Sequence, residues 1–218
     1  MSDRLAVLPQ YLLPKKALTA FAGFVAGAEA GSLTTALIRW FAGRYKVNMQ
    51  EAANPDFASY PSFNAFFTRA LKPGVRPLAD ADLVCPVDGA ISQFGPITGE
   101  RIFQAKGHDY TTQALLAGDT ALAEAFRDGS FATLYLSPRD YHRIHMPCGG
   151  RLQRMIHVPG RLYSVNPATA RGVPGLFASN ERVVCVFESP QGPFVMVLVG
   201  ATIVGSMATV WHGVVNPP

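Results

Sequence analysis

The stretches "ERVVCVFES" (residues 181–189) and "PFVMVLVGATIVGSM" (residues 193–207) decide the fold that we expect for this chain. Both are rich in Val, Ile and Phe, and a Pro and a Gly lie in the short gap between them. Apolar runs of this composition, bounded by turn residues, are typical of β-strands. We therefore predict that both stretches contain strands of about five to eight residues.

Three further runs from residue 83 onward have the same texture. They read "LVCPVDGAISQFG" (83–95), "FATLYLS" (131–137) and "RLQRMIHV" (151–158). We expect each run to contain a strand of about five to eight residues, since turn residues separate them.

Two other stretches have the apolar spacing of helices. In residues 59–78, apolar side chains recur at helical spacing between Phe63 and Leu71, before Pro73 ends the pattern. Residues 111–126 read "TTQALLAGDTALAEAF" and form a second helical stretch. The sequence thus predicts an α+β fold: a mainly antiparallel β-sheet body with helices at the N-terminus and one helical insertion.

The composition is that of a chain with a real hydrophobic core. Of 218 residues, 49% are hydrophobic and 16% are charged, which excludes a disordered chain and suits one domain with an appendage. The three cysteines are widely spaced and odd in number. They indicate neither a disulfide framework nor a paired C-x-x-C metal site, and a reducing compartment fits them best.

The net charge of +4 is concentrated at the N-terminus. Residues 1–50 contain six basic and two acidic groups, whereas the remaining chain is balanced. We therefore expect residues 1–46 to form a membrane-associating helical region and residues 47–218 to form a β-rich domain. The expected binding surface is an anionic membrane, and no nucleic-acid partner is expected.

Residues 17–43 carry the apolar character of this N-terminal region. The run at residues 17–28 is about 12 residues long, short of the ~20 that a membrane-spanning helix needs. After Gly31, Ser32 is a plausible N-cap for a helix with apolar residues from Leu33 onward and arginines between them. This pattern predicts a helix that lies in the membrane interface.

Two other interpretations of residues 17–43 remain open. One is an ordinary amphipathic helix that packs on the body of the protein. The other is a signal peptide, because Lys15 and Lys16 precede the apolar run and Ala28-Glu29-Ala30 mimics a cleavage site.

The segment "YLSPRDYHRIHMPCGG" (135–150) concentrates ionisable side chains, including two of the five histidines. Ser137 followed by Pro138 has the form of a helix start. One or two helical turns over residues 138–145 would place His142 and His145 on the same face. A helical conformation of this segment would therefore make a joint site of the two histidines possible, whereas on a strand this spacing would send them to opposite faces.

Three kinds of chemistry fit that histidine pair. Both residues could be structural, with their ring nitrogens hydrogen-bonded at a sheet edge. A metal site could use His142, His145 and Cys148 with Asp88 or Cys85, although the spacing matches no common zinc pattern. Acid–base catalysis is the third, with Asp88 orienting one imidazole.

Several stretches resemble the pyruvoyl-dependent phosphatidylserine decarboxylases of bacteria and mitochondria. Between about residues 60 and 211 they read, in family order, "SFNAFFTRALKPGVRP", "CPVDGAIS", "QAKGHDY", "YLSPRDYHRIHMPCGG", "VPGRLYSVNPAT", "LFASNERVV" and "VGATIVGSMATVW". The N-terminal "QYLLPKKALT" also fits this family. A resemblance of this extent is highly specific.

The resemblance implies a carboxy-lyase that converts phosphatidylserine to phosphatidylethanolamine and CO₂. The family's cofactor is a covalent pyruvoyl group, which forms a Schiff base with the substrate amine and delocalises the charge left by CO₂. The family makes it by cutting its own chain at a Gly–Ser bond in a motif resembling L-G-S-T.

The resemblance also implies roles for individual residues. Asp88 in "PVDG" and His145 in "HRIHMP" match the family's relay for self-cleavage, with His145 as the base and Asp88 as its partner. His142 matches the histidine that donates a proton to the substrate carbon. For His108 and Arg139 a functional and a structural role both stay open, whereas His157 and His212 are expected to be structural.

The chain departs from the family pattern in one respect: no L-G-S-T occurs before "VVNPP". Its Gly–Ser pairs are Gly31–Ser32, Gly129–Ser130 and Gly205–Ser206. We therefore expect this chain to be most of the family's larger β chain, or a truncated proenzyme, with a catalytic domain over residues 47–218 that is incomplete at its C-terminus. By itself such a chain should neither cleave itself nor decarboxylate its substrate.

The expected partners are phosphatidylserine, the small α chain that carries the pyruvoyl group, an anionic membrane and possibly further copies of the chain. The expected location is the cytoplasmic face of the cell membrane, as a peripheral protein. A catalytically inactive, lipid-binding relative remains the alternative.

Overall fold

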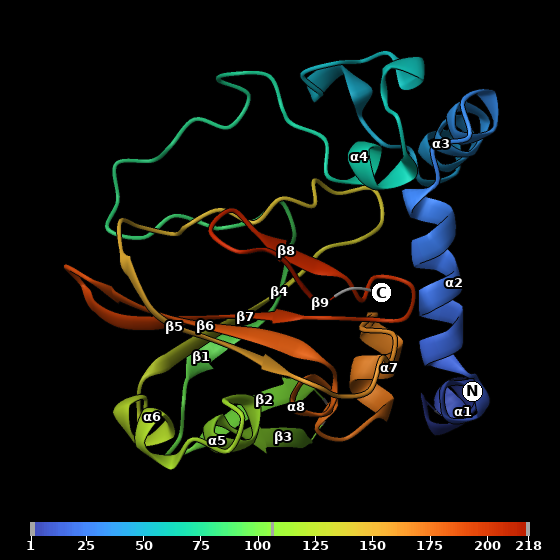
Figure 1. Ribbon diagram of the computed structural model, residues 1–218. Coiled ribbons are helices and arrows are strands. Elements are labelled where there is room, and N and C mark those ends of the chain that lie inside the picture. Colours follow the sequence, from blue (N-terminus) through green and yellow to red (C-terminus); the bar gives the residue numbers. More distant parts are fainter. Residues whose placement is uncertain (1–2, 106, 217–218) are drawn as a thin grey trace.

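The computed structural model describes residues 3–105 and 107–216, with a group of helices along one side of a β-rich body (Figure 1). The first helices are α1 (Asp3–Leu12), α2 (Lys15–Gly27) and α3 (Ser32–Tyr45). Two 3₁₀ turns, η1 (Met49–Glu51) and η2 (Phe57–Ser59), lead to the short α4 (Phe63–Phe67). The fold is α+β, as the sequence predicts.

Within the described residues, the body contains four antiparallel sheets. The largest has the order β5-β6-β7 and consists of β5 (Arg151–Val158), β6 (Arg182–Ser189) and β7 (Gly192–Val199). The pairs are β1 (Ala90–Pro96) with β4 (Ser130–Tyr135), β2 (Arg101–Ala105) with β3 (His108–Thr111), and β8 (Met207–Thr209) with β9 (Gly213–Asn216). The predicted strands in residues 131–137, 151–158 and 181–189 are therefore confirmed, and the run at residues 193–207 is a strand up to Val199.

The central strand β6 is buried on both faces. Val184 and Val186 pack on one side with Leu116, whereas Cys185 and Phe187 belong to a cluster on the other side. Successive side chains of a strand point to opposite faces, so a continuous apolar run is what a two-sided core requires. This explains why "VVCVF" shows no polar alternation.

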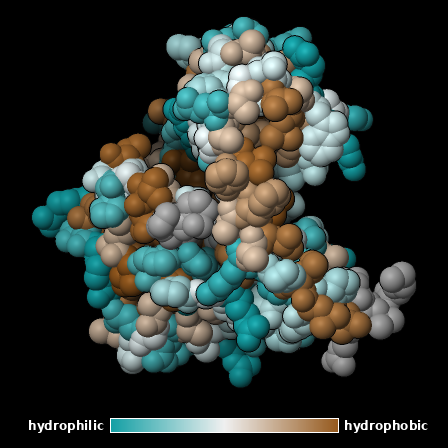
Figure 2. All heavy atoms as spheres, turned by 45° about the vertical axis from the view of Figure 1, so that its right-hand side comes forward, coloured by the Kyte–Doolittle hydropathy of each residue, from teal (hydrophilic) through white to brown (hydrophobic). Residues whose placement is uncertain are grey.

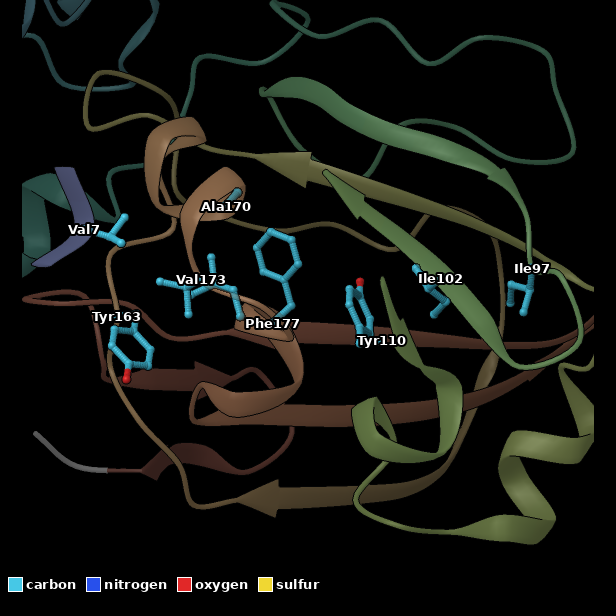
Figure 3. Packing of buried hydrophobic residues seen from close by; sticks show 9 residues of the cluster. Val7, Ile97, Ile102, Tyr110, Tyr163, Ala170, Val173 and Phe177 are labelled. Carbon is cyan, nitrogen blue, oxygen red and sulfur yellow. The ribbon is translucent and has the colours of Figure 1, made fainter. Parts of the chain in front are cut away.

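Helix α1 contributes to the main hydrophobic cluster of the body. Val7 is 3% exposed and belongs to the same cluster as Ala170 and Val173, at and just after α7 (Pro167–Gly172) (Figure 3). Two hydrogen bonds attach the N-terminal helices further: Ser164 N–H donates to Gln10 Oε1 at 3.1 Å, and Ile203 N–H donates to Thr19 Oγ1 at 3.0 Å. The helical region is thus anchored to the body at several points.

Helices α2 and α3 meet at a sharp bend of 116°. Within the described ranges, no single helix has the length and apolar character to cross a membrane, but this bent pair passes that test as a broken span or re-entrant loop. The predicted cap is wrong by one residue, because Gly31 occupies the N-cap position and Ser32 is already helical.

Two predicted helices are shorter than expected. The helix in residues 59–78 ends at Phe67, because the following chain pairs with the η1 region: Lys72 N–H donates to Glu51 O at 2.9 Å. The stretch 111–126 forms α5 (Thr112–Leu115) and α6 (Thr120–Ala125), because Ala117 and Gly118 have positive φ angles that end the first helix.

Several elements were not anticipated from the sequence. These are strands β2 and β3, helix α7, and the short α8 (Leu176–Ser179). The run at residues 83–95 is a strand only from Ala90, since the preceding residues contact the segment that carries the two histidines.

Candidate active site

Residues 137–146 form a tight turn followed by an extended segment, so the predicted helical turns over residues 138–145 are wrong. Ser137 N–H donates to Asp140 Oδ2 at 2.6 Å, and Asp140 N–H donates to Ser137 O at 2.9 Å. Further on, His145 N–H donates to Pro86 O at 2.9 Å instead of to a carbonyl of a preceding helical turn. A long-range contact has replaced the local helix.

This extended segment lies beside residues 84–88. Val84 N–H donates to Pro147 O at 2.8 Å, in addition to the bond from His145 to Pro86. The next residue after this stretch must be small, because a Cβ at Gly89 would lie 2.6 Å from Tyr135 O. Together these contacts bring the Asp88 region next to the histidine segment.

His145 is held by a tyrosine. Its Nε2 lies 3.0 Å from Tyr141 Oη, and the two rings stack with centroids 5.6 Å apart. Tyr141 is buried, whereas His145 is exposed. Burial raises the pKa of Tyr141, so the phenol stays protonated at neutral pH and can hold the imidazole in a fixed orientation.

Asp88 is engaged by an arginine. Arg76 Nε donates to both carboxylate oxygens of Asp88 at 2.7 and 2.9 Å, and Arg76 Nη2 also donates to Glu51 at 2.7 Å. The hydrogen bond that Arg76 donates to Asp88 is the main cause that raises the pKa of Arg76. Among the described residues, no hydrogen bond joins Asp88 directly to His145.

Tyr141 interacts with both of these residues. Burial is the main cause of its raised pKa, and the negative charge of Asp88 adds to it. The hydroxyl of Tyr141 is also the group that is hydrogen-bonded to His145. Asp88, Tyr141 and His145 therefore lie within one electrostatic neighbourhood. The direct relay between Asp88 and His145 that the sequence resemblance implies stays a prediction.

His142 has a different environment from His145. Its Nδ1 lies 2.8 Å from Asp140 O, and because a carbonyl can only accept, Nδ1 carries the hydrogen. Its ring centroid lies 4.0 Å from that of Phe67, and burial lowers its pKa. His142 is thus a neutral imidazole at neutral pH, and Nε2, which carries the lone pair, is the atom available for proton transfer.

The metal alternative requires several donor side chains at one point. His142 is turned to Phe67 and His145 to Tyr141. In the parts of the chain that the structure describes, no three His, Cys, Asp or Glu side chains are arranged to hold a metal ion. The donor set His142, His145 and Cys148 therefore does not converge.

The other histidines lie away from this segment or in the sheets. His157 on β5 pairs with Glu181 at 3.1 Å, and His108 lies at the start of β3. An open pocket of about 670 Å³ follows the histidines along the chain, with Met146, Pro147 and Cys148 in its wall, and neither His142 nor His145 lines it.

Two residues of this arrangement were not selected from the sequence. Arg76 stands in "GVRP" and Tyr141 in "DYHRIH", both inside stretches that resemble the family. Nothing local distinguishes them, because their importance comes from partners that the fold supplies. The resemblance itself was the available signal.

The comparisons with known proteins agree with that resemblance. A family model described as phosphatidylserine decarboxylase matches residues 63–215, and a second, described as PSD, matches residues 5–46. The chain is 76% identical, over all of its 218 residues and 77% of the relative, to a phosphatidylserine decarboxylase proenzyme of Polaromonas sp.. The proenzymes of Acidovorax ebreus (75%, with 77% of the relative covered) and Azoarcus sp. (77%, with 76% covered) are similarly close. This chain belongs to the phosphatidylserine decarboxylase family.

Proposed function

We propose that this chain is the larger part of a phosphatidylserine decarboxylase, which forms phosphatidylethanolamine and CO₂ for phospholipid biosynthesis once a pyruvoyl-bearing segment completes it. The observation that carries the proposal is the family match over residues 63–215, inside which the Tyr141–His145 pair and His142 lie. The relatives are named proenzymes, which fits a chain that matures by processing.

The side chains at the site suit a pyruvoyl group, because they are proton-transfer groups with separate environments. His145 is exposed and His142 is half-buried, and each has one ring nitrogen held by a hydrogen bond. When present, the pyruvoyl group supplies the electron sink that decarboxylation needs. The residues of this chain supply the proton transfers and the orientation.

In maturation, His145 acts as the base that takes the proton of the serine hydroxyl in the completing segment. Tyr141 holds the imidazole ring, and the Asp88 carboxylate favours the positive charge that develops on it. Asp88 keeps its own position through Arg76.

In decarboxylation, Nε2 of the neutral His142 ring takes up a proton from water, and the imidazolium so formed delivers that proton to the substrate carbon. The bond from Nδ1 to Asp140 O fixes which nitrogen is free. The lowered pKa of His142 makes its protonated form a ready donor.

The test is to express the chain in frame with a C-terminal segment that contains L-G-S-T. Mass spectrometry reports cleavage, and release of labelled CO₂ from carboxyl-labelled phosphatidylserine reports activity. Cleavage without CO₂ release by the matured protein would favour the inactive, lipid-binding relative.

We further propose a peripheral location on the cytoplasmic face of the cell membrane. Support comes from exposed apolar side chains on α2 and α3: Phe21 is 68% exposed, Phe24 76%, Leu33 74% and Trp40 61%. Figure 2 shows apolar surface running along these helices. The basic residues nearby suit anionic lipid, and three free cysteines suit a reducing compartment.

A further inference from the structure

Arg69 and Arg182 are almost equally buried but differ in their contacts. Arg69 is 4% exposed and Arg182 is 3% exposed. The guanidinium of Arg182 donates four hydrogen bonds to backbone carbonyls at 2.7–2.9 Å. Arg182 is therefore a structural residue, because backbone carbonyls of the protein accept the hydrogen bonds of its guanidinium.

The guanidinium of Arg69 has no such partners. Within residues 3–105 and 107–216 it makes no hydrogen bond or ion pair, and its Nε is fully buried without a partner. It does make a cation–π contact with the Phe66 ring, whose centroid lies 5.3 Å from Arg69 Cζ. A buried cation without hydrogen-bonded partners is costly to a fold, so its retention points to a ligand.

The available carboxylate near Arg69 is already used. Burial lowers the pKa of Arg69, and Glu51 is close enough for its negative charge to act in the opposite direction. However, Glu51 Oε2 accepts a hydrogen bond from Arg76 at 2.7 Å and makes no ion pair with Arg69 in the described structure. Arg69 therefore has no anionic partner of its own among the described residues.

The position of Arg69 links it to the candidate active site. It follows α4, whose last residue Phe67 stacks on His142, while Thr68 O accepts a hydrogen bond from Arg143 Nε at 2.7 Å. Alongside the effect of burial, the positive charge of Arg69 acts to lower the pKa of both Tyr141 and His142. The short helix α4 therefore places an unpaired cation near His142, the histidine to which the proposed function assigns proton delivery.

We propose that Arg69 binds the phosphodiester of the phospholipid headgroup and so positions the serine carbon next to His142. This inference rests on the proposed function. A guanidinium suits the task, because its planar donors match two phosphate oxygens at once.

The headgroup carries a second anion, its carboxylate, but that group suits Arg69 less well. Decarboxylation removes the carboxylate charge, so an ion pair with it would stabilise the starting state more than the transition state and slow the reaction. The phosphodiester keeps its charge throughout. A pair with the phosphodiester therefore strengthens binding without raising the barrier.

The binding test uses water-soluble headgroups and calorimetry on the 218-residue chain. Glycerophosphoserine and glycerophosphoethanolamine should both bind, because both contain the phosphodiester, and serine should bind far more weakly. Arg69→Met should weaken both by about tenfold or more, the loss expected for a charge-assisted contact. Inorganic phosphate separates general phosphate binding from headgroup binding, because only headgroup recognition makes both glycerophosphodiesters bind more tightly than phosphate.

Two further variants make the result specific to Arg69. Arg101→Gln removes an exposed arginine that pairs with Asp109 and should leave binding unchanged. Arg69→Lys keeps the charge but loses the planar donors, so it should bind with intermediate affinity. Thermal unfolding without ligand should show Arg69→Met at least as stable as the unsubstituted chain, since it removes a buried, unpaired cation.

Several outcomes would overturn the proposal. These are an absence of headgroup binding by the unsubstituted chain, equal binding by Arg69→Met, or a loss of serine binding while glycerophosphoethanolamine binding persists, which would assign Arg69 to the carboxylate. Destabilisation of both Arg69 variants without ligand would mark a structural role. None of these outcomes depends on maturation, so failure of the L-G-S-T chain to release CO₂ is a separate result that speaks only to the proposed function.

Discussion

Tyr141 Oη lies 3.0 Å from His145 Nε2, so a buried phenol and an exposed imidazole share one hydrogen bond. The bond joins a side chain that cannot move freely to one that solvent and substrate can reach. It also leaves His145 Nδ1 as the nitrogen opposite the tyrosine. The orientation of the proposed base therefore depends on Tyr141.

The first prediction concerns this bond. Tyr141→Phe keeps the aromatic stack but removes the hydroxyl, so in the chain completed with L-G-S-T it should slow self-cleavage by about tenfold, the value of a lost orienting hydrogen bond. The rate is followed by mass spectrometry. Tyr11→Phe, at an exposed position on α1, is the control. An unchanged cleavage rate in Tyr141→Phe would mean that Tyr141 does not orient the base.

The second prediction separates the two histidines. In the completed chain, His145→Ala and Asp88→Asn should each slow cleavage about 100-fold or more, because the serine would lack an oriented base. His142→Ala should still cleave, at least in part, but release CO₂ poorly. Normal maturation of His145→Ala with failed maturation of His142→Ala would reverse these roles. No effect of any change would make both histidines structural.

The third prediction follows from the lowered pKa of His142. In the pH range between its folded pKa and about 6.5, the unfolded chain binds more protons at this position than the folded chain. His142 should therefore reduce the free energy of unfolding as pH falls below about 6.5, and its effect is fully expressed only below the folded pKa. Urea unfolding of the unsubstituted chain and of His142→Gln at pH 7.5 and 5.0 measures this. His142→Gln should lose less stability on acidification, and parallel losses would contradict the lowered pKa.

The fourth prediction tests the proposed membrane surface without deleting it. Removing residues 1–46 would also remove Val7 from the core, so substitutions are the sharper experiment. The double variant Phe24→Ser/Trp40→Ser should bind anionic vesicles about tenfold or more weakly, because apolar contact with the lipid is lost. Added salt should weaken vesicle binding by the unsubstituted chain. Phe94→Ser on β1, which is 75% exposed in the unsubstituted chain, is the matched control. Equal binding by all variants would exclude α2 and α3 as the contact surface.

The fifth prediction concerns Arg182 as a structural residue. Arg182→Met leaves the carbonyls of Ala114, Leu115 and Ala178 without their buried donor. We expect a loss of about 3 kcal/mol in the free energy of unfolding, measured in urea. Arg101→Met, at an exposed position, should change it little. A loss below about 1 kcal/mol would show that the carbonyls find other donors.

The strands of the largest sheet were predictable because their signal is local. Apolar β-branched runs between turn residues identify β5, β6 and β7, and burial of β6 on both faces is the reason that its run is continuous. The helical turns around His142 were predicted wrongly because the deciding bond, from His145 to Pro86, joins distant residues. Sequence periodicity contains no information on such a bond.

The same reasoning explains what could be predicted of the site. Resemblance to a family selected Asp88, His142 and His145, which the fold does bring into one region. It did not indicate that Asp88 bonds to Arg76 or that His145 bonds to Tyr141. Those pairings depend on how an extended segment lies against residues 84–88, and that is a tertiary property.

The place of Val7 in the main core cluster has a consequence for the order of folding during synthesis. Val7 leaves the ribosome early, whereas its partners Ala170 and Val173 are made much later. The cluster cannot close until most of the chain has emerged, because contacts between distant residues form only after the intervening chain exists. During this interval the apolar helices α1 and α2 have no body to pack against. The nascent chain is therefore able to meet a lipid surface before its sheets are complete.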